Sequence, residues 1–486
     1  MKRRSISLLI LASLILSQIS CGNEAPSNDK ESPDSSDSTV EETSVDETTD
    51  NVRINDDLPE NDFGGKEFPI LTVSWFGAKS FIYADTQNGD VMNDALYESI
   101  STVEERFNVD ISVNDGEVAD NVDTIMHNLV MSGDDTYKLY YGHDLRTVKG
   151  ALNGDFLDIK ALPNINFDKP WWRGTSDNFT IDGKLYFTGN CLALSGIFMN
   201  YVLAVNKKLA DDYMVDIPYD KVVAGEWYID DLTALIKDFP NDLDGDGEMT
   251  ENDMYGFITS HYGHLGMQSD LGGTVLIKDE SGNLKFVDNA SHIVGVLEKV
   301  AELMTHGTDK FGESNEYGQI VFVENKALFM FGEMRTLYTQ VRPKDIVYGI
   351  LPFPKYDETQ KEYRSSGCDI YWAVPKSSYG DAEMISTVVE ALCCKNYNDV
   401  VPKVWELVLG RKLSDSEEDT AMFEIIRNAQ YVDLGYAFSG QSNKLTDLVF
   451  MTKNTTSDQV ASYIEKRRDA VIAKIDEINT TIAELE

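Results

Sequence analysis

Residues 68–75, FPILTVSW, predict the first strand of the fold. An amphipathic helical pattern over residues 92–107 follows, and then a second strand-like segment, VDISVN, at residues 109–114. Another helical pattern over residues 122–130 leads to the strand-like run KLYYG at residues 138–142. This βαβαβ order predicts an α/β fold with a mostly parallel sheet flanked by helices. Such sheets bind ligands beyond the carboxyl ends of their strands, so the loops after the first and third strands become candidate binding loops.

The composition bounds the size and the partners of the protein. With 486 residues, 42% hydrophobic and 10% aromatic, the chain is long enough for two or three domains with large cores. The 83 acidic residues exceed the 42 basic ones, and a net charge of −41 makes nucleic acid an unfavourable partner. Five cysteines exclude a disulfide scaffold, and no zinc-type Cys or His spacing is present.

The first residues have the pattern of an export signal. Three basic residues at positions 2–4 precede the uncharged apolar residues 5–20, which are too few for a comfortable membrane span. Ser20 and Cys21 then resemble the end of a bacterial lipobox, although Gln18 stands where leucine is usual. We therefore expect a lipoprotein signal peptide over residues 1–21 and a lipid anchor at Cys21 on the outer face of the cell membrane. An ordinary secretory signal is the alternative.

Residues 22–62 predict a disordered acidic tether. They contain 14 acidic and two basic residues and no aromatic residue, so they cannot bury a core. A flexible coil of this length reaches on the order of 35 Å, enough to hold a domain clear of a membrane.

Several motifs, in order, resemble a known family. They are TVEERFNVDISV (102–113), YYGHDLRTVKGALNGDFLDI (140–159), TIDGKLYFTG (180–189), FMNYVLAVNKKLA (198–210), NKALFMFGEMRTLY (325–338) and the segment 347–378. Together they resemble a family 1 extracellular solute-binding protein of an ABC importer, the group that contains maltose-binding protein. The resemblance covers about residues 63–480.

The resemblance implies a two-lobe, periplasmic-binding-protein-like fold of type II, with a ligand cleft between the lobes that closes about a hinge. It places the first part of lobe 1 at 63–190 and the first part of lobe 2 at 191–350. Residues 351–395 would return to lobe 1 and complete it, and 396–486 would supply C-terminal helices mainly to lobe 2. A monomer of this kind captures a carbohydrate and delivers it to ABC permease subunits, and it is not an enzyme.

A long C-terminal helix is predicted over residues 456–485. Its apolar stripe consists of Val460, Ile464, Val471, Ile475 and Ile478, which indicates a surface helix with one buried face.

Sugar binding needs flat aromatic faces for the apolar side of the ring and hydrogen-bonding groups for its hydroxyls. By the resemblance, Trp75 and Lys79 occupy the loop after the first strand, and His143 and Asp144 occupy the loop after the third. Arg146 is displaced by one residue from the family's arginine.

Other candidate ligand-binding residues lie further along the chain. Trp171 and Trp172 fall in an irregular polar stretch, DKPWWRGTSD, which suggests an exposed aromatic platform, with one tryptophan capping the core of the lobe as the alternative. Glu333 and Arg335 occupy a turn that carries stacking aromatics in the family. Trp372 lies in the strand IYWAVP, where it and Tyr371 point to opposite faces and one of the two belongs to the core.

The segment from Asp242 to Asp253 has the spacing of a calcium loop. Oxygen-bearing side chains stand at positions 1, 3, 5, 7, 9 and 12 around a glycine at position 6, namely Asp242, Asp244, Asp246, Glu248, Thr250 and Asp253. The aspartate at position 12 makes the loop resemble that of dockerins. We expect a structural Ca²⁺, with a solvated acidic turn as the alternative.

The remaining cysteines suggest little chemistry. Cys191 and Cys368 both fall at predicted lobe crossings, so a disulfide between them is one possibility and two free thiols the other.

Two other classes of protein compete with a binding protein. A secreted glycosidase would use two carboxylates, whose separation a sequence does not show. A surface adhesin would share the tether and the calcium loop, but it would usually show internal repeats, and none is visible.

Overall fold

The computed structural model describes residues 53–117, 119–239, 242–309, 321–367, 370–405 and 417–485, and Arg53–Glu486 form one compact unit. The expected signal peptide, the lipid-bearing Cys21 and the tether up to residue 52 lie outside the described residues.

The predicted tether ends earlier than residue 62. Arg53 donates two hydrogen bonds to the carboxylate of Asp399, and Arg106 pairs with Asp56. Ile54 and Leu58 pack against a hydrophobic core. Residues 53–62 therefore belong to the folded unit, because two apolar side chains and two ion pairs offset the cost of ordering them.

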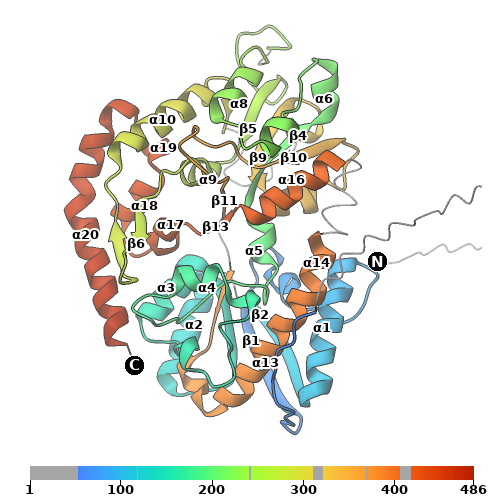
Figure 1. Cartoon of the computed structure of the whole chain (residues 1–486), viewed down its shortest axis with the longest axis vertical. Coiled ribbons are helices and arrows are strands. Elements are labelled where there is room, and N and C mark those ends of the chain that lie inside the picture. The colour runs from blue at the N-terminus through green and yellow to red at the C-terminus, as the bar shows by residue number, and fades with distance from the viewer. Residues whose placement is uncertain are drawn as a thin grey trace, which may run out of the picture. The chain divides into compact units, whose positions relative to one another are not determined.

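The first sheet has the strand order β12-β3-β1-β2, and Figure 1 labels its strands β1 and β2. Its strands are β1 (Lys66–Val73), β2 (Val109–Glu117), β3 (Leu139–His143) and β12 (Ile370–Ala373). β1 pairs in parallel with β2 and β3, whereas β12 is antiparallel to β3. Helices α1 (Val91–Phe107) and α2 (Ala119–Ser132) connect the parallel strands, which confirms the predicted βαβαβ order.

The start and end of α1 follow from local chemistry. The side chain of Asp90 accepts hydrogen bonds from the backbone N–H groups of Met92 and Asn93, as an N-cap does. At the other end Asn108 adopts a left-handed conformation (φ 51°), so the chain turns directly into β2. The apolar face of α1 is buried.

The second sheet has the order β10-β4-β9-β5-β8. Its strands are β4 (Tyr201–Asn206), β5 (Tyr255–Thr259), β8 (Gly307–Thr308), β9 (Ala327–Glu333) and β10 (Tyr348–Leu351). β5 is parallel to β8 and β9, but β4 is antiparallel to both of its neighbours. Parallel pairing therefore dominates the first sheet, and the second sheet is mixed.

Three chain segments meet where the chain passes between the two sheets. Asn200 bridges to Gly367, and β11 (Ser365–Ser366) pairs in parallel with β13 (Gln430–Tyr431). The hydroxyl of Ser365 donates to the carbonyl of Tyr201 at 2.7 Å. We call these segments the crossing; Figure 1 shows β11 and β13 there, beside the short helix α5 (Ser195–Phe198).

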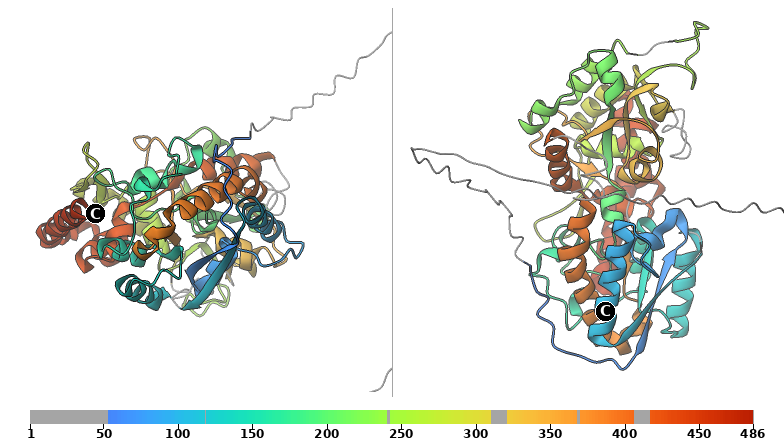
Figure 2. Two further views of the ribbon diagram at one scale, coloured as in Figure 1. Left: turned by 90° about the horizontal axis from the view of Figure 1, so that it is seen from below. Right: turned by 90° about the vertical axis from the view of Figure 1, so that its right-hand side faces the viewer.

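The other helices cover the sheets, and Figure 2 shows α13 beside α1 and the first sheet. None of the described helices is long and apolar enough to cross a lipid bilayer. The remaining elements are α3 (Asp144–Leu152), α4 (Thr175–Phe179), α6 (Lys207–Asp212), α7 (Tyr219–Val223), α8 (Ile229–Ile236), α9 (Gly263–Asp270), β6 (Leu276–Lys278), β7 (Leu284–Phe286), α10 (Ala290–Met304), α12 (Met334–Thr336), α13 (Ala382–Lys395), α14 (Val401–Lys403), α16 (Glu417–Asn428), α17 (Leu434–Ser439), α18 (Asn443–Val449), α19 (Met451–Asn454) and α20 (Val460–Glu484).

Helix α20 confirms the predicted buried stripe. Its five apolar residues are all buried, in the same cluster as residues of the first sheet such as Phe68 and Ile111. The helix packs against α3 as well as α10. The expected assignment of residues 396–486 mainly to lobe 2 stays a prediction, since α20 contacts helices from both halves of the fold.

Candidate functional site

A cavity of about 460 Å³ lies at the strand ends of both sheets, and we call it the cleft cavity. Its volume is within the range of ligand pockets, about 300 to 1,000 Å³. Trp75 follows β1, His143 ends β3, Tyr262 follows β5, and Glu333 ends β9. The site therefore lies where the strand-end rule for α/β sheets places ligands.

The lining combines aromatic rings with polar groups. Trp75 is 40% exposed and Tyr262 is 49% exposed, so both offer ring faces to a ligand. The full lining consists of Trp75, His143, Leu145, Tyr201, His261, Tyr262, Leu265, Glu333, Arg335, Tyr436, Ser439, Thr446, Phe450, Lys453 and Asn454.

Trp75 is held against His143. The two ring centroids are 4.9 Å apart at an interplanar angle of 33°. Behind them the carboxylate of Asp144 lies 2.6 Å from Nδ1 of His143 and accepts the backbone N–H of Leu145 at 2.7 Å. Asp144 is fully buried and is not among the lining residues, so the structure places it beside His143 and out of reach of a ligand in the cavity.

Glu333 and Arg335 form an ion pair in the lining of the cleft cavity. The guanidinium of Arg335 donates from Nε at 3.1 Å and from one terminal nitrogen at 2.8 Å to a single carboxylate oxygen of Glu333. Glu333 pairs across the strands with Tyr201, whose ring stacks on Phe331 with centroids 5.2 Å apart. These strand contacts hold the charged groups at fixed positions toward a ligand.

One lysine adds a positive charge to this lining. Lys453 belongs to α19, and partial burial lowers the pKa of its ammonium group from the ordinary value. Lys79, in contrast, is not among the lining residues. Its ammonium group lies 3.5 Å from the carboxylate of Asp85 and 5.2 Å from the ring centroid of Tyr83.

The expectation that Trp171 and Trp172 are exposed is wrong. They are 3% and 1% exposed, because both indole N–H groups donate to the carboxylate of Glu390, at 3.2 and 2.7 Å. Burial raises the pKa of Glu390 to about 7, against the opposing effect of these hydrogen bonds. The polar residues around the two tryptophans give no sign of this burial, because the partner Glu390 lies far along the chain.

Trp372 belongs to the same buried group. It is fully buried, its ring lies edge-on to Trp172 with centroids 5.9 Å apart, and its N–H donates to Asn190 at 3.1 Å. Tyr371 is also buried, so both residues of the pair are in the core, on opposite faces of the strand. Of the eight predicted ligand-binding residues, Trp75, Glu333 and Arg335 meet in the cleft cavity.

Sequence reasoning missed several lining residues. His261 and Tyr262 follow β5, and a strand assigned at residues 255–259 would have pointed to them by the strand-end rule. Tyr436 and Phe450 come from the helical C-terminal region, where no sequence signal distinguishes them from core residues.

The acidic loop brings three predicted metal ligands together. One carboxylate oxygen from each of Asp242, Asp244 and Asp246 lies within 4.8 Å of the others. A backbone hydrogen bond from Asp246 lowers the pKa of Asp244, but burial and the neighbouring carboxylates outweigh it, so the pKa is raised overall. This repulsion is what a bound cation would relieve.

Asp253 has a different position from the one expected for a metal ligand. Its carboxylate accepts the backbone N–H groups of Leu243 at 2.9 Å and Thr250 at 2.7 Å, and it closes the loop on itself. Among the described His, Cys, Asp and Glu residues, the group within reach of one ion comprises the three aspartates and does not include Glu248 or Asp253. The hydroxyl of Thr250 donates to the carboxylate of Asp253 at 3.1 Å.

Cys191 is a free thiol that donates to the backbone carbonyl of Cys393 at 3.3 Å. Burial raises the pKa of the Cys393 thiol well above the ordinary value. Cys368, the residue that the sequence offers as a disulfide partner for Cys191, lies outside the described residues, so the pairing stays untested.

Solved structures share this architecture. The cyclic α-maltosyl-1,6-maltose binding protein from Arthrobacter globiformis superposes with a TM-score of 0.55 at 15% identity, over 84% of this chain and 99% of that one. The chain has the fold of extracellular solute-binding proteins. The ABC substrate-binding protein Lmo0181 from Listeria monocytogenes, solved in complex with cycloalternan, gives a TM-score of 0.51 at 14% identity over 86% and 99% of the two chains. Maltose-bound MalE3 from T. maritima gives 0.52 at 13% identity over 84% and 100%.

These similarities confirm the predicted α/β, periplasmic-binding-protein-like fold. No protein-family model matches the sequence, and no curated protein sequence matches it either. The three solved relatives are binding proteins for sugars or substrates.

Proposed function

We propose that this protein is an extracellular solute-binding protein that captures a carbohydrate by hinge closure and delivers it to an ABC permease. The observation that carries the proposal is the cleft cavity, in which exposed aromatic rings and a fixed ion pair meet at the strand ends of both sheets. The fold and the sugar ligands of the solved relatives support it.

The chemistry of the cleft cavity suits a sugar. Trp75 and Tyr262 offer flat faces to the apolar side of a pyranose ring, and Glu333 and Arg335 offer an acceptor and donors to its hydroxyls. Glu333 and Arg335 take the place of aromatic residues that the sequence resemblance leads one to expect. We propose that, because of this replacement, the site prefers a more polar ligand.

A glycosidase is the competing proposal. Hydrolysis of a glycosidic bond needs two carboxyl groups on either side of that bond. Glu333 is the one carboxylate among the described lining residues of the cleft cavity, and Arg335 neutralises it. This arrangement favours binding without turnover.

Binding and hydrolysis are separated by titrating soluble oligosaccharides, maltose and maltotriose first, into the protein and recovering the sugar by mass spectrometry. We expect saturable binding, intact sugar and a smaller radius of gyration by X-ray scattering. Shortened sugar would support the glycosidase, and an unchanged radius at saturation would oppose hinge closure. A surface adhesin would bind immobilised glycan but would not support uptake by cells that contain the permease.

We further propose that Cys21 carries a lipid that holds the protein at the outer face of the membrane. The test is the mass of the membrane-extracted protein and its release into the medium by Cys21→Ala. If Cys21 is unmodified and the wild-type protein is itself released into the medium, the segment is an ordinary secretory signal.

We also propose a structural Ca²⁺ at the acidic loop, held by Asp242, Asp244 and Asp246. Their mutual proximity supports the proposal, since three carboxylates around one point suit a hard cation. The ion would stabilise the loop and would take no part in sugar binding.

A further inference from the structure

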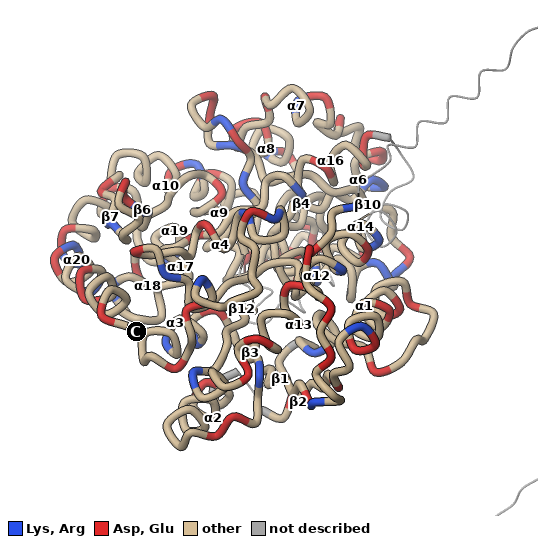
Figure 3. The backbone as a smooth tube through the Cα atoms, turned by 60° about the horizontal axis from the view of Figure 1, so that its bottom comes forward, with Lys and Arg blue, Asp and Glu red and all other residues tan. Residues whose placement is uncertain are grey.

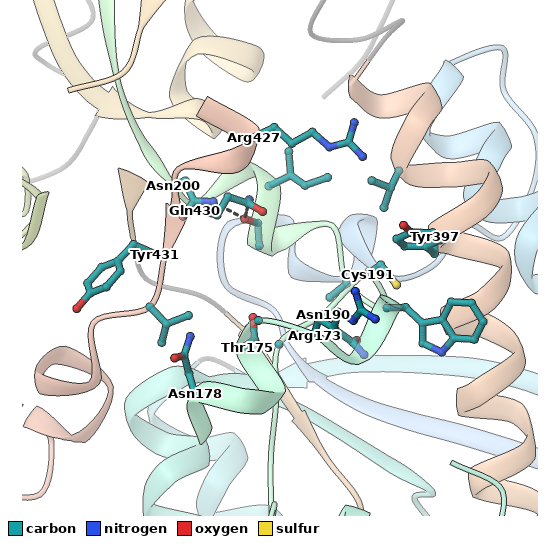
Figure 4. A pocket seen from close by; sticks show the side chains of 18 of the residues that line it. Arg173, Thr175, Asn178, Asn190, Cys191, Asn200, Tyr397, Arg427, Gln430 and Tyr431 are labelled. Atoms are coloured by element: carbon teal, nitrogen blue, oxygen red, sulfur yellow. Dashed lines mark hydrogen bonds between the residues drawn. The ribbon is translucent and has the colours of Figure 1, made fainter. Parts of the chain in front are cut away.

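A second cavity, of about 330 Å³, lies beside the crossing, and Figure 4 shows it from close by. We call it the crossing cavity. Its lining includes Gly196, Asn200, Gly367 and Gln430 of the crossing segments. Asn200 and Tyr201 are successive residues, yet Asn200 lines the crossing cavity and Tyr201 the cleft cavity. The two cavities therefore lie on opposite sides of the chain at this point.

The charge of the crossing cavity is unusual for this protein. Acidic residues outnumber basic ones by 83 to 42 and occur throughout the unit shown in Figure 3. The described lining nevertheless holds two arginines, Arg173 and Arg427, and no aspartate, glutamate or lysine. Two guanidinium groups in a described lining without a carboxylate offer a small anion a locally favourable contact on a chain of net charge −41.

Neither arginine is neutralised by a close partner. Arg173 forms an ion pair with no carboxylate among the described residues, and Arg427 has Glu424 at the long distance of 4.0 Å, with both side chains substantially exposed. The two guanidinium groups come from different halves of the fold. Arg173 follows the buried Trp171 and Trp172 of the first core, and Arg427 belongs to α16, which packs on β10 of the second sheet.

Amide and aromatic side chains complete the lining. Asn178 and Asn428 add hydrogen-bonding groups, and the half-buried Tyr397 adds ring surface, whereas Trp171 and Trp405 border the cavity but are 3% and 7% exposed. The side-chain amides of Gln430 and Asn200 already have a partner, since both donate to the carbonyl of Gly196, at 2.7 and 2.5 Å. In Figure 4, Arg427 and Arg173 lie above and below the space that Tyr397 borders.

We infer that the crossing cavity is a second ligand site, for a small organic anion whose carboxylate or phosphate group lies between Arg173 and Arg427. Guanidinium groups form strong, paired hydrogen bonds with both anions. The apolar part of the ligand packs on the ring surface at the side. The site is separate from the cleft cavity and does not depend on the proposed sugar binding.

The test uses calorimetric titration of the full chain at constant ionic strength with inorganic phosphate, citrate and glucose 6-phosphate, and with glucose as the uncharged partner of the last. The variants are Arg173→Gln and Arg427→Gln. The matched control is Arg468→Gln, which changes an arginine of α20 that pairs with Asp288, outside the lining. Thermal melts confirm that each variant is folded.

We expect at least one anion to bind saturably to the wild type and at least about tenfold more weakly to each lining variant, with Arg468→Gln unchanged. Failure of all three anions to bind would overturn the inference, and so would equal affinity in the wild type and either lining variant. A Trp75→Ala variant should keep the anion affinity. The anion result can therefore be interpreted even if the sugar proposal fails.

Discussion

The ring of Trp75 lies against the ring of His143, with centroids 4.9 Å apart, and each residue comes from the end of a different strand. The contact restrains the exposed indole, and the buried carboxylate of Asp144 lies 2.6 Å from Nδ1 of this imidazole. An aromatic face held in this way loses little side-chain entropy when a sugar binds.

Replacing Trp75 should weaken sugar binding most among the aromatic residues. Trp75→Ala removes a ring that would bury its face on the ligand, and we expect a loss of about 1.5 to 3 kcal/mol, or roughly tenfold to a hundredfold in Kd. Trp75→Phe should keep much of the affinity. Tyr379→Ala removes an aromatic side chain that is 71% exposed and outside the cleft cavity, so calorimetry should find it unchanged.

The ion pair between Glu333 and Arg335 should matter for both binding and stability. Arg335→Leu leaves the buried carboxylate of Glu333 without this partner, which costs about 1 to 3 kcal/mol of unfolding free energy. The double variant Glu333→Gln with Arg335→Leu should recover part of that stability but not the sugar affinity. Urea unfolding and titration of the same samples measure both quantities. Equal stability of the single and double variants would show that the pair is not coupled.

Glu390 should make the stability depend on pH. Its pKa in the folded protein is about 7 against an ordinary 4.5, so the folded state holds a proton that the unfolded state has released. The stability from this group is fully present below pH 4.5 and falls as the pH rises through about 7, with a slope of up to about 1.4 kcal/mol per pH unit. Glu390→Gln should flatten the curve of unfolding free energy between pH 4.5 and about 7. An unchanged slope in the variant would contradict the assignment.

Calcium should stabilise the protein without changing sugar affinity. At about 100 times its Kd, an ion that binds only the folded form adds ~2.7 kcal/mol, so chelation should lower the Tm. Replacing Asp242 and Asp246 with alanine should abolish this response. The control is the pair Asp279→Ala and Glu280→Ala in another acidic turn, which should respond like the wild type. A lost sugar affinity in the loop variant would place the metal in the cleft instead.

The sequence predicts the first sheet well because its signals are local. Alternating helical and strand periods between residues 68 and 142 specify β1, α1, β2, α2 and β3, and the strand-end rule then selects Trp75. The stripe of α20 is equally local, since its residues repeat with the period of one helix.

The failures of sequence reasoning concern contacts between distant segments. Trp171 and Trp172 stand among polar residues, but Glu390 satisfies both indoles from a helix 218 or more positions away. Tyr436 and Phe450 reach the cleft cavity only because α17, α18 and α19 pack beside α9 and α3. Neither set of contacts can be predicted without the tertiary structure.

The central claim is that the cleft cavity binds a carbohydrate and leaves it unaltered. The most direct measurement is calorimetric titration of a panel of soluble oligosaccharides into wild-type protein and Trp75→Ala, with mass spectrometry of the recovered sugar. We predict that at least one oligosaccharide binds saturably to the wild type, binds at least about tenfold more weakly to Trp75→Ala, and is recovered intact. The claim is contradicted if no oligosaccharide binds, if Trp75→Ala binds as well as the wild type, or if the recovered sugar is shortened.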